Sequence, residues 1–326
     1  MNCKMKHLIS LIILLALTNA KAGNVWTVDC GTITTQRLDP IVFPNYSPAG
    51  HVHAIVGADT FSHNVTYEDL QTSTCTTCNV LTDKSNYWVP QLYVHKKSDG
   101  KFYHVEMEFH VYYKLIDDEG QTDPINNPTD PGAIRAFPPG FQMVAGSPKQ
   151  TEKTEFVGHK CYGPMTSTYG FPSQPEKCTG GIRGEVTFPS CWDGKNLGHG
   201  DYKGHVSYPV GGNWMAGPCP DSHPVRIPTL FFEAIFFTQD VIEEGDELVY
   251  SFNDKSGFGF HGDFVNGWEE GVVQEAIDYC ASHYDGSETH CQIVKSGFTD
   301  CRWQGTDDES VYRGVLDELP PYNPPF

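Results

Sequence analysis

Histidines beside glycine, valine and aromatic residues are the side chains best suited to metal or acid–base chemistry in this chain. Histidine is the commonest metal ligand in proteins, and its ordinary pKa suits a general acid or base near neutral pH. In the string Gly-His-Val-His, an extended backbone would place His51 and His53 on one face, about 6–7 Å apart. Such a pair could chelate zinc or copper.

Three further histidines lie in similar settings, in Gly204-His-Val206, Ser222-His-Pro224 and Phe260-His-Gly-Asp-Phe264. In the last string, Gly262 would let a ligand approach the backbone closely. We predict that a divalent metal (zinc, copper or calcium) is held by His51, His53, His205 and His223, and that His261 and Asp263 are catalytic. The alternative is that each histidine is a hydrogen-bonded structural residue.

A second candidate for chemistry is Glu233, which lies among apolar residues in Leu-Phe-Phe-Glu-Ala-Ile-Phe-Phe. A glutamate buried in a strand needs a partner, and Arg226 or a histidine could provide one. Two carboxylates on either side of a sugar cleft would cleave a glycosidic bond. We therefore predict Glu233 as a catalytic acid, with a purely structural ion pair as the alternative.

Sugar binding would also use exposed aromatic rings. We predict Trp88, Trp192 and Asp193 as binding residues, because indole rings can stack on sugars. The alternatives are that the tryptophans belong to the core and that Asp193-Gly194 forms a turn. The sequence has no Gly-x-Ser-x-Gly nucleophile elbow, P-loop or dinucleotide fingerprint.

Short strands joined by turns are expected to position these side chains. Residues 103–114 alternate between apolar and polar types over twelve positions, which predicts a strand with one buried face. Further strands are predicted at 88–95, 226–237 and 247–252, and a helix at 268–283. Surface loops are predicted at 120–132, 147–155 and 163–181. The expected fold is mainly β: an antiparallel sandwich or jelly-roll-like single domain with a few short helices, stapled by disulfides.

Export is indicated by the first 22 residues. Lys4 and Lys6 precede an apolar run from Leu8 to Leu17, and Ala20-Lys-Ala22 is a small-x-small cleavage signal. We predict a signal peptide at 1–22, a single β-rich domain at 23–301 and a proline-rich tail at 302–326. Ten of the eleven cysteines follow the leader, which favours disulfides over a zinc site at Cys75-Thr-Thr-Cys78.

The composition restricts the partners. The formal net charge is −19, and the predicted leader contains three lysines and no acidic residue, so the mature chain is more acidic still. This charge argues against nucleic acid or an anionic membrane surface as a partner. No later stretch resembles a membrane span. Asn45-Tyr-Ser47 and Asn64-Val-Thr66 are glycosylation sequons, so a secreted, extracellular glycoprotein is expected; the sequence does not indicate an oligomeric state.

An ordered series of motifs resembles a known family. It includes Arg37-Leu-Asp-Pro40, Gly50-His-Val-His53, Ala136-Phe-Pro-Pro-Gly-Phe141, Phe188-Pro-Ser-Cys-Trp-Asp-Gly194 and Gly259-Phe-His-Gly-Asp-Phe264. The chain, from about residue 37 to residue 291, is similar to a secreted, mostly fungal domain of unknown function that often accompanies WSC sugar-binding modules. The resemblance implies an extracellular, wall-associated protein and points to the same histidine and carboxylate segments.

The leading hypothesis is a secreted protein associated with cell-wall or other extracellular polysaccharide, which cleaves glycosidic bonds with a histidine–carboxylate site that holds a divalent metal. The alternative is a non-catalytic glycan-binding or structural wall protein. A copper oxidase is a third option. It is disfavoured because the common histidine brace needs an N-terminal histidine, whereas the predicted mature chain begins at Gly23.

Overall fold

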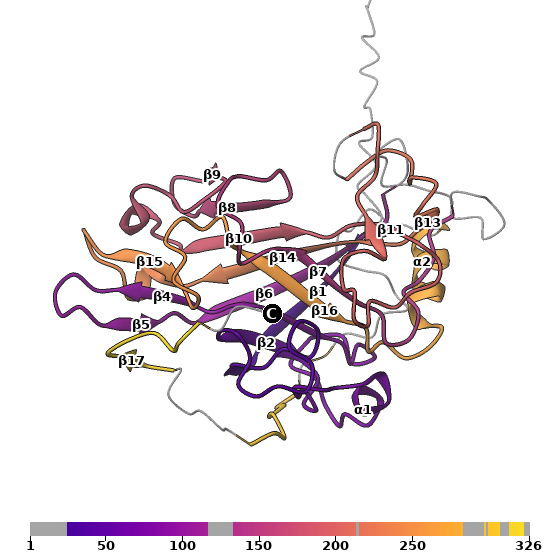
Figure 1. Ribbon diagram of the computed structural model, residues 1–326, viewed down its shortest axis with the longest axis horizontal. Coiled ribbons are helices and arrows are strands. Elements are labelled where there is room, and N and C mark those ends of the chain that lie inside the picture. Colours follow the sequence, from indigo (N-terminus) through magenta and orange to yellow (C-terminus); the bar gives the residue numbers. More distant parts are fainter. Residues whose placement is uncertain are drawn as a thin grey trace, which may run out of the picture.

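A ten-stranded antiparallel sheet forms the body of the computed structural model (Figure 1), which describes residues 25–116, 133–212, 215–282, 297, 299–306 and 313–322. The predicted signal peptide and the loop predicted at 120–132 fall outside these residues. In spatial order the strands are β7 (Gln142–Gly146), β16 (His261–Val265), β3 (Asn86–Pro90), β2 (His53–Gly57), β1 (Val25–Gln36), β6 (Met107–Lys114), β14 (Thr229–Phe236), β10 (Ile182–Thr187), β8 (Val157–Cys161) and β9 (Thr166–Thr168).

Two smaller antiparallel sheets and a few short helices complete the described fold. One sheet has the order β12 (Val206–Ser207), β11 (Cys191–Trp192), β13 (Val225–Arg226), and the other has the order β15 (Glu247–Tyr250), β4 (Leu92–His95), β5 (Phe102–His104), β17 (Val315–Leu316). The helices are α1 (Tyr67–Gln71) and α2 (Val272–Ser282), with single 3-10 turns η1 (Pro175–Lys177) and η2 (Thr238–Asp240). The predicted fold class, mainly β and antiparallel, is confirmed. Among the described helices, none has the length and apolar character that a bilayer span requires.

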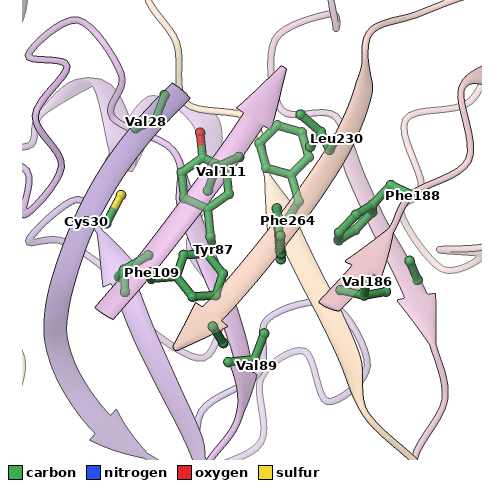
Figure 2. Packing of buried hydrophobic residues seen from close by; sticks show 14 of the residues in the cluster. Val28, Cys30, Tyr87, Val89, Phe109, Val111, Val186, Phe188, Leu230 and Phe264 are labelled. Carbon is green, nitrogen blue, oxygen red and sulfur yellow. The ribbon is translucent and has the colours of Figure 1, made fainter. Parts of the chain in front are cut away.

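The main core lies between the two halves of the curled sheet. Figure 2 shows side chains of β1, β3, β6, β10, β14 and β16 meeting there. Two glycines let the halves approach closely: a Cβ on Gly184 would lie 2.8 Å from the ring of Phe260, and one on Gly262 would lie 2.8 Å from that of Phe232. Because interiors are close-packed, no larger residue fits at either position without displacing its neighbour.

A second, smaller core lies on the other face of the β7–β16–β3–β2 half. It contains Ile55, Trp88, Val144 and Val265, one residue from each of these four strands. The segment 37–51 and helix α1 contribute Leu38, Ile41 and Leu70 to the same cluster. Residues of β16 therefore alternate between the two cores: Gly262 and Phe264, like Phe260 just before the strand, are directed toward the main core. His261, Asp263 and Val265 are directed toward the smaller one.

Several predicted elements are shorter than expected. The strand predicted at 103–114 is split into β5 and β6, and the strand predicted at 88–95 is split into β3 and β4. Both breaks occur where the chain passes from one sheet to another. At this point the side-chain amide of Gln91 donates to the carbonyls of Leu92 (2.7 Å) and Val105 (2.8 Å). The strand predicted at 226–237 is split into β13 and β14 at Pro228, which lacks the N–H that a ladder needs. The helix predicted from 268 begins only at Val272, because Trp268 is buried and donates to Tyr113 Oη (2.7 Å).

Four disulfides tie the described chain together: Cys30–Cys78, Cys75–Cys301, Cys161–Cys178 and Cys191–Cys219. The preference for disulfides over zinc at Cys75 and Cys78 is therefore confirmed, since the two cysteines have different disulfide partners. The side chains of Cys280 and Cys291 lie outside the described residues. The Cys75–Cys301 bond joins residues 226 positions apart and fixes the segment after α2 to the smaller core. Such a framework is typical of proteins that fold in an oxidising compartment.

Candidate metal centre

Three histidines from two neighbouring parts of the sheet meet in one buried cluster. His53 is the first residue of β2 and His261 the first residue of β16, and β3 lies between these strands. His51 precedes β2 by two positions. One ring nitrogen of each histidine lies within 4.8 Å of those of the other two, and all three residues are buried. Sheet order thus brings together ligand candidates that are 210 positions apart in the chain.

Backbone carbonyls fix the tautomers of two of these rings. His53 Nδ1 donates to Leu38 O (3.0 Å), and His261 Nδ1 donates to Gly259 O (2.8 Å). A carbonyl oxygen only accepts, so each Nδ1 carries the proton and each Nε2 presents a lone pair. Histidines that bind metals are commonly oriented by a second hydrogen bond of this kind.

The remaining ring nitrogens have few partners. His51 Nε2 lies 3.1 Å from His261 Nε2, whereas His51 Nδ1 and His53 Nε2 are buried and have no hydrogen-bond partner in the part of the chain that the structure describes. Burial lowers the pKa of His51 and His53 well below the ordinary value and that of His261 to about 4, and charge on neighbouring histidines adds to the effect for His51 and His53. All three are therefore neutral at physiological pH, which is the form that ligates a metal.

A small cavity of about 90 Å³ adjoins this cluster and contains two aspartates. Asp263 lies two residues after His261 on the same face of β16, and both its carboxylate oxygens are buried with no hydrogen-bond partner among the described residues. Burial raises the pKa of Asp263 well above its usual value, and the charge of Asp39 adds to this. Burial also raises the pKa of Asp39 to about 7, against hydrogen bonds from the backbone N–H groups of Val42 and Ile41. An unpartnered buried carboxylate requires a proton or a cation.

Aromatic rings and the segment 313–322 close one side of the cluster. The ring of His51 lies 5.1 Å from that of Phe252 and 6.0 Å from that of Tyr322. Arg37 Nη1 donates to Pro321 O (3.0 Å), which attaches this segment to the chain that carries Leu38 and Asp39. The part of the predicted tail at 313–322 is thus packed against the domain.

The donor set determines which metals suit the cluster. Three imidazole nitrogens are ligands for zinc or copper, and three protein ligands with one open position are common in catalytic zinc sites. Calcium, the third expected metal, binds six to eight oxygen atoms, so three histidines do not suit it. A second potential ligand group is Asp59 with Cys75 and Cys301, but its cysteines form a disulfide and cannot bind a metal as thiolates.

The structure does not bring His205 or His223 to the cluster. His205 is buried beside the three-stranded sheet, where Nδ1 donates to Asp201 O (3.1 Å) and the ring lies 5.0 Å from that of Phe141. His223 is partly exposed, with Nε2 3.0 Å from Gly204 O and Nδ1 2.8 Å from Ser222 Oγ. Both positions fit the alternative of hydrogen-bonded structural histidines.

Glu233 lies on the other half of the sheet, away from the histidine cluster. Its Oε1 is 2.7 Å from Arg183 Nη1, and its Oε2 accepts from Tyr112 Oη (3.1 Å). The expectation that Arg226 pairs with Glu233 is wrong, because Arg226 donates to Ser190 Oγ (3.2 Å) at the three-stranded sheet. A histidine does lie beside Glu233: His110 is directly opposite it on β6, and the two groups interact electrostatically. Glu233 therefore cannot act together with Asp263 on one bond.

The predicted sugar-binding residues have mainly structural environments. Trp88 is 0 % exposed, 5.0 Å from the ring of Phe61, so the expectation that it stacks on a sugar is wrong. Trp192 is half-buried, and its indole N–H donates to Asn196 O (2.7 Å). Asp193 Oδ1 accepts from the backbone N–H groups of Lys195 and Asn196 (2.8 and 2.9 Å), which is the turn that was the alternative for this residue.

Asp39 was missed as a site residue from the sequence. It occurs in Arg37-Leu-Asp-Pro40, one of the strings on which the family resemblance depends, and that was the only available signal. An aspartate before a proline is ordinarily read as a turn residue. Only the fold shows that segment 37–51 crosses the smaller core and brings Asp39 to the cavity beside Asp263.

Together, fold and site define a disulfide-stapled, mainly β protein with a buried three-histidine cluster beside a small cavity lined by two aspartates and two lysines. The chain belongs to the family described as Domain of unknown function (DUF1996), whose model matches residues 39–268. The predicted membership in a domain-of-unknown-function family is therefore confirmed. The matched region contains the three histidines and both aspartates. Comparison with the curated proteins and with the solved structures finds no match.

Proposed function

We propose that this chain is a secreted, extracellular metalloprotein that hydrolyses glycosidic bonds of wall polysaccharide. One zinc or copper ion would be held by His51, His53 and His261. The observation that supports this proposal is the convergence of three buried, neutral imidazoles, two of them oriented by backbone carbonyls. A buried cluster with unpartnered ring nitrogens is costly unless it has a ligand.

The cavity beside the histidines supports a hydrolytic role. A metal ion held by histidines lowers the pKa of a bound water and so supplies a nucleophile at neutral pH. Asp263 lies at this cavity beside Lys203, and neither of its carboxylate oxygens has a hydrogen-bond partner among the described residues; it would accept a proton from such a water or hold it for a leaving oxygen. Asp39 lines the same cavity and could exchange protons with Asp263.

The compartment supports polysaccharide as the substrate class. Four disulfides, the predicted leader and two sequons with exposed asparagines all suit an extracellular protein. The acidic charge disfavours nucleic acid and anionic surfaces. Polysaccharide is the substrate class that the family resemblance and the compartment share.

A second candidate function is a non-catalytic wall protein in which the metal only stabilises the fold. It is favoured by the size of the cavity, since about 90 Å³ is well below the volume of an ordinary ligand pocket. Under this proposal Asp263 would be protonated and would have no part in a reaction.

A measurement of the metal content tests the metal site on which both the catalytic and the non-catalytic candidate function depend. Mature protein purified without a histidine tag, after incubation with zinc or copper, should contain about one equivalent of metal by mass spectrometry. The His51→Ala/His53→Ala double variant should contain none. His223→Ala is the matched control, because His223 lies outside the cluster, and it should retain the metal. Metal-free wild-type protein after both incubations would refute the site.

Turnover separates the two candidates. Release of reducing ends from insoluble β-1,3-glucan, cellulose and chitin should require the metal and should be lost in Asp263→Asn, which keeps the histidines. A parallel reaction with added ascorbate and oxygen tests for oxidative copper chemistry, which would release product only when both are present. Metal-loaded protein that releases no product from any of these substrates would leave the non-catalytic role.

A further inference from the structure

The outer face of the other half of the sheet contains an unusual row of charged residues. His110 of β6, Glu233 of β14 and Glu185 of β10 lie directly opposite one another in register, with Glu233 in the middle. Their neighbours in each strand, such as Phe109, Phe232 and Val186, are directed toward the main core, so the row lies on the face away from it. This face is separate from the histidine cluster, which lies on the β2–β16 half.

Two carboxylates face each other in this row without an intervening residue. Like charges opposite each other on adjacent strands destabilise a sheet. Here Arg183 offsets the repulsion: it contacts Oε1 of Glu233 through Nη1 (2.7 Å) and Oε1 of Glu185 through Nε (2.7 Å). Among the described residues Oε2 of Glu185 forms no hydrogen bond or ion pair, so this oxygen is available to accept a hydrogen bond from a ligand.

A pocket of about 360 Å³ opens beside Glu185. Its walls include two aromatic rings, Tyr169 of the β9 turn and Phe231 of β14, and the hydroxyl side chains of Ser167, Thr168 and Thr187. Tyr169 is 47 % exposed, and Phe231 is half-buried. The volume falls within the usual range for small-ligand sites, and the lining combines apolar rings with a few polar groups, as such sites do.

We propose that this pocket binds one sugar unit of a neutral polysaccharide, with Tyr169 and Phe231 against the C–H faces and Glu185 as hydrogen-bond acceptor for its hydroxyl groups. The charges around the pocket favour a neutral ligand. An anionic sugar would meet Glu155 and Glu185 in the lining. A cationic sugar would meet two ammonium groups: that of Lys153, 5.0 Å from the ring centre of Tyr169, and that of Lys114, which lies over one face of Phe231 at 3.8 Å and leaves the other face for the sugar.

This inference builds on the proposed polysaccharide function, because it assigns the surface that holds the substrate chain, but it does not depend on the metal. A wall protein with either role, catalytic or structural, would need such a surface. The pocket also gives Arg183 and Glu233 a positioning role: Arg183, on the same strand as Glu185, holds that carboxylate in a fixed orientation, and Glu233 of the neighbouring strand holds Arg183.

Calorimetry with defined oligosaccharides tests the inference. The full mature protein is titrated with laminarihexaose, cellohexaose, chitohexaose and mannohexaose, and at least one should bind. Tyr169→Ala/Phe231→Ala should weaken that binding at least tenfold. Glu185→Gln, which keeps the size of the side chain, should weaken it by a similar factor. Near-UV circular dichroism checks that each variant is folded.

Two control variants test whether the loss of affinity is specific to this pocket and independent of the metal site. Tyr46→Ala removes an aromatic ring that is 58 % exposed on segment 37–51 and should leave affinity unchanged. The His51→Ala/His53→Ala variant should also bind the oligosaccharide normally while losing the metal, which separates this inference from the proposed metal site. No binding of any of the four sugars, or equal affinity in Glu185→Gln and wild type, would overturn the proposal.

Discussion

The pH dependence of stability offers a quantitative test of the structure, because two buried groups have shifts of opposite sign. Burial lowers the pKa of His159 from 6.5 to about 4, while its Nε2 lies 2.9 Å from Tyr250 Oη. Burial raises the pKa of Asp83 from 3.8 to about 6, with Tyr87 Oη 2.5 Å from its Oδ2. Neither residue contacts the histidine cluster through a hydrogen bond in the described structure.

The sign for each group follows from which state binds more protons. Between pH 6.5 and 4 the unfolded chain protonates His159 more readily than the folded chain does, so stability is lost as the pH falls through this window. At about 1.36 kcal/mol per pKa unit, the loss between pH 7.5 and pH 4 is about 3 kcal/mol. For Asp83 the folded chain binds the proton more tightly, so its contribution is present below pH 3.8 and is lost as the pH rises through about 6. That change is about 2 kcal/mol over the same range.

Guanidinium unfolding at pH 7.5, 5.5 and 4, with the disulfides intact, measures both effects. His159→Gln should be less stable than wild type at pH 7.5, but the deficit should shrink by about 3 kcal/mol at pH 4. Asp83→Asn is the matched control, and its stability relative to wild type should fall by about 2 kcal/mol over the same change. A difference between His159→Gln and wild type that stays constant from pH 7.5 to pH 4 would refute the burial of a neutral His159.

Three further predictions concern packing and local structure. Gly262→Ala should destabilise the protein by about 1–3 kcal/mol in urea unfolding, because the added Cβ would lie 2.8 Å from the ring of Phe232; an unchanged midpoint would mean that the halves of the sheet are farther apart. Replacing Cys191 and Cys219 together by serine should cost about 2–4 kcal/mol in the same assay, since their disulfide closes a loop over 28 positions. Asp193→Ala should lose about 1 kcal/mol of stability and leave oligosaccharide affinity unchanged, whereas weakened sugar binding would restore its predicted binding role.

Local sequence patterns predicted the parts of the fold that depend on neighbouring residues. The alternation in 107–114 indicated a strand with one buried face, and β6 has that pattern of buried and partly exposed residues. The breaks near Gln91 and Pro228 were missed although Gln91 and Pro228 are visible in the sequence, because a long apolar run outweighed them. Strand ends depend on which sheet each segment joins, and that choice is made by distant partners.

In the candidate site, too, the sequence predicted what depends on neighbouring residues and missed what depends on distant ones. The string Gly-His-Val-His was enough to pair His51 with His53, whose ring centres lie 4.2 Å apart. To predict that His261 joins that pair and that His205 does not, one must know that only β3 separates β16 from β2 in the sheet. No local pattern encodes this order, because strands adjacent in the sheet are far apart in the chain. Glu233 was recognised as a buried carboxylate for the right reason, but its partner Arg183 comes from β10, fifty positions earlier.

The distance along the chain between the parts of the metal centre has a consequence for biosynthesis. His51 and His261 are separated by 210 positions, and Tyr322, which lies against His51, comes later still. During synthesis from the N-terminus, His51 and His53 emerge long before β16 exists, so the three-histidine cluster cannot form until β16 has also been made. At the proposed metal site, loading with metal would therefore follow synthesis of β16, and the metal bound would be one available where the nearly complete chain folds.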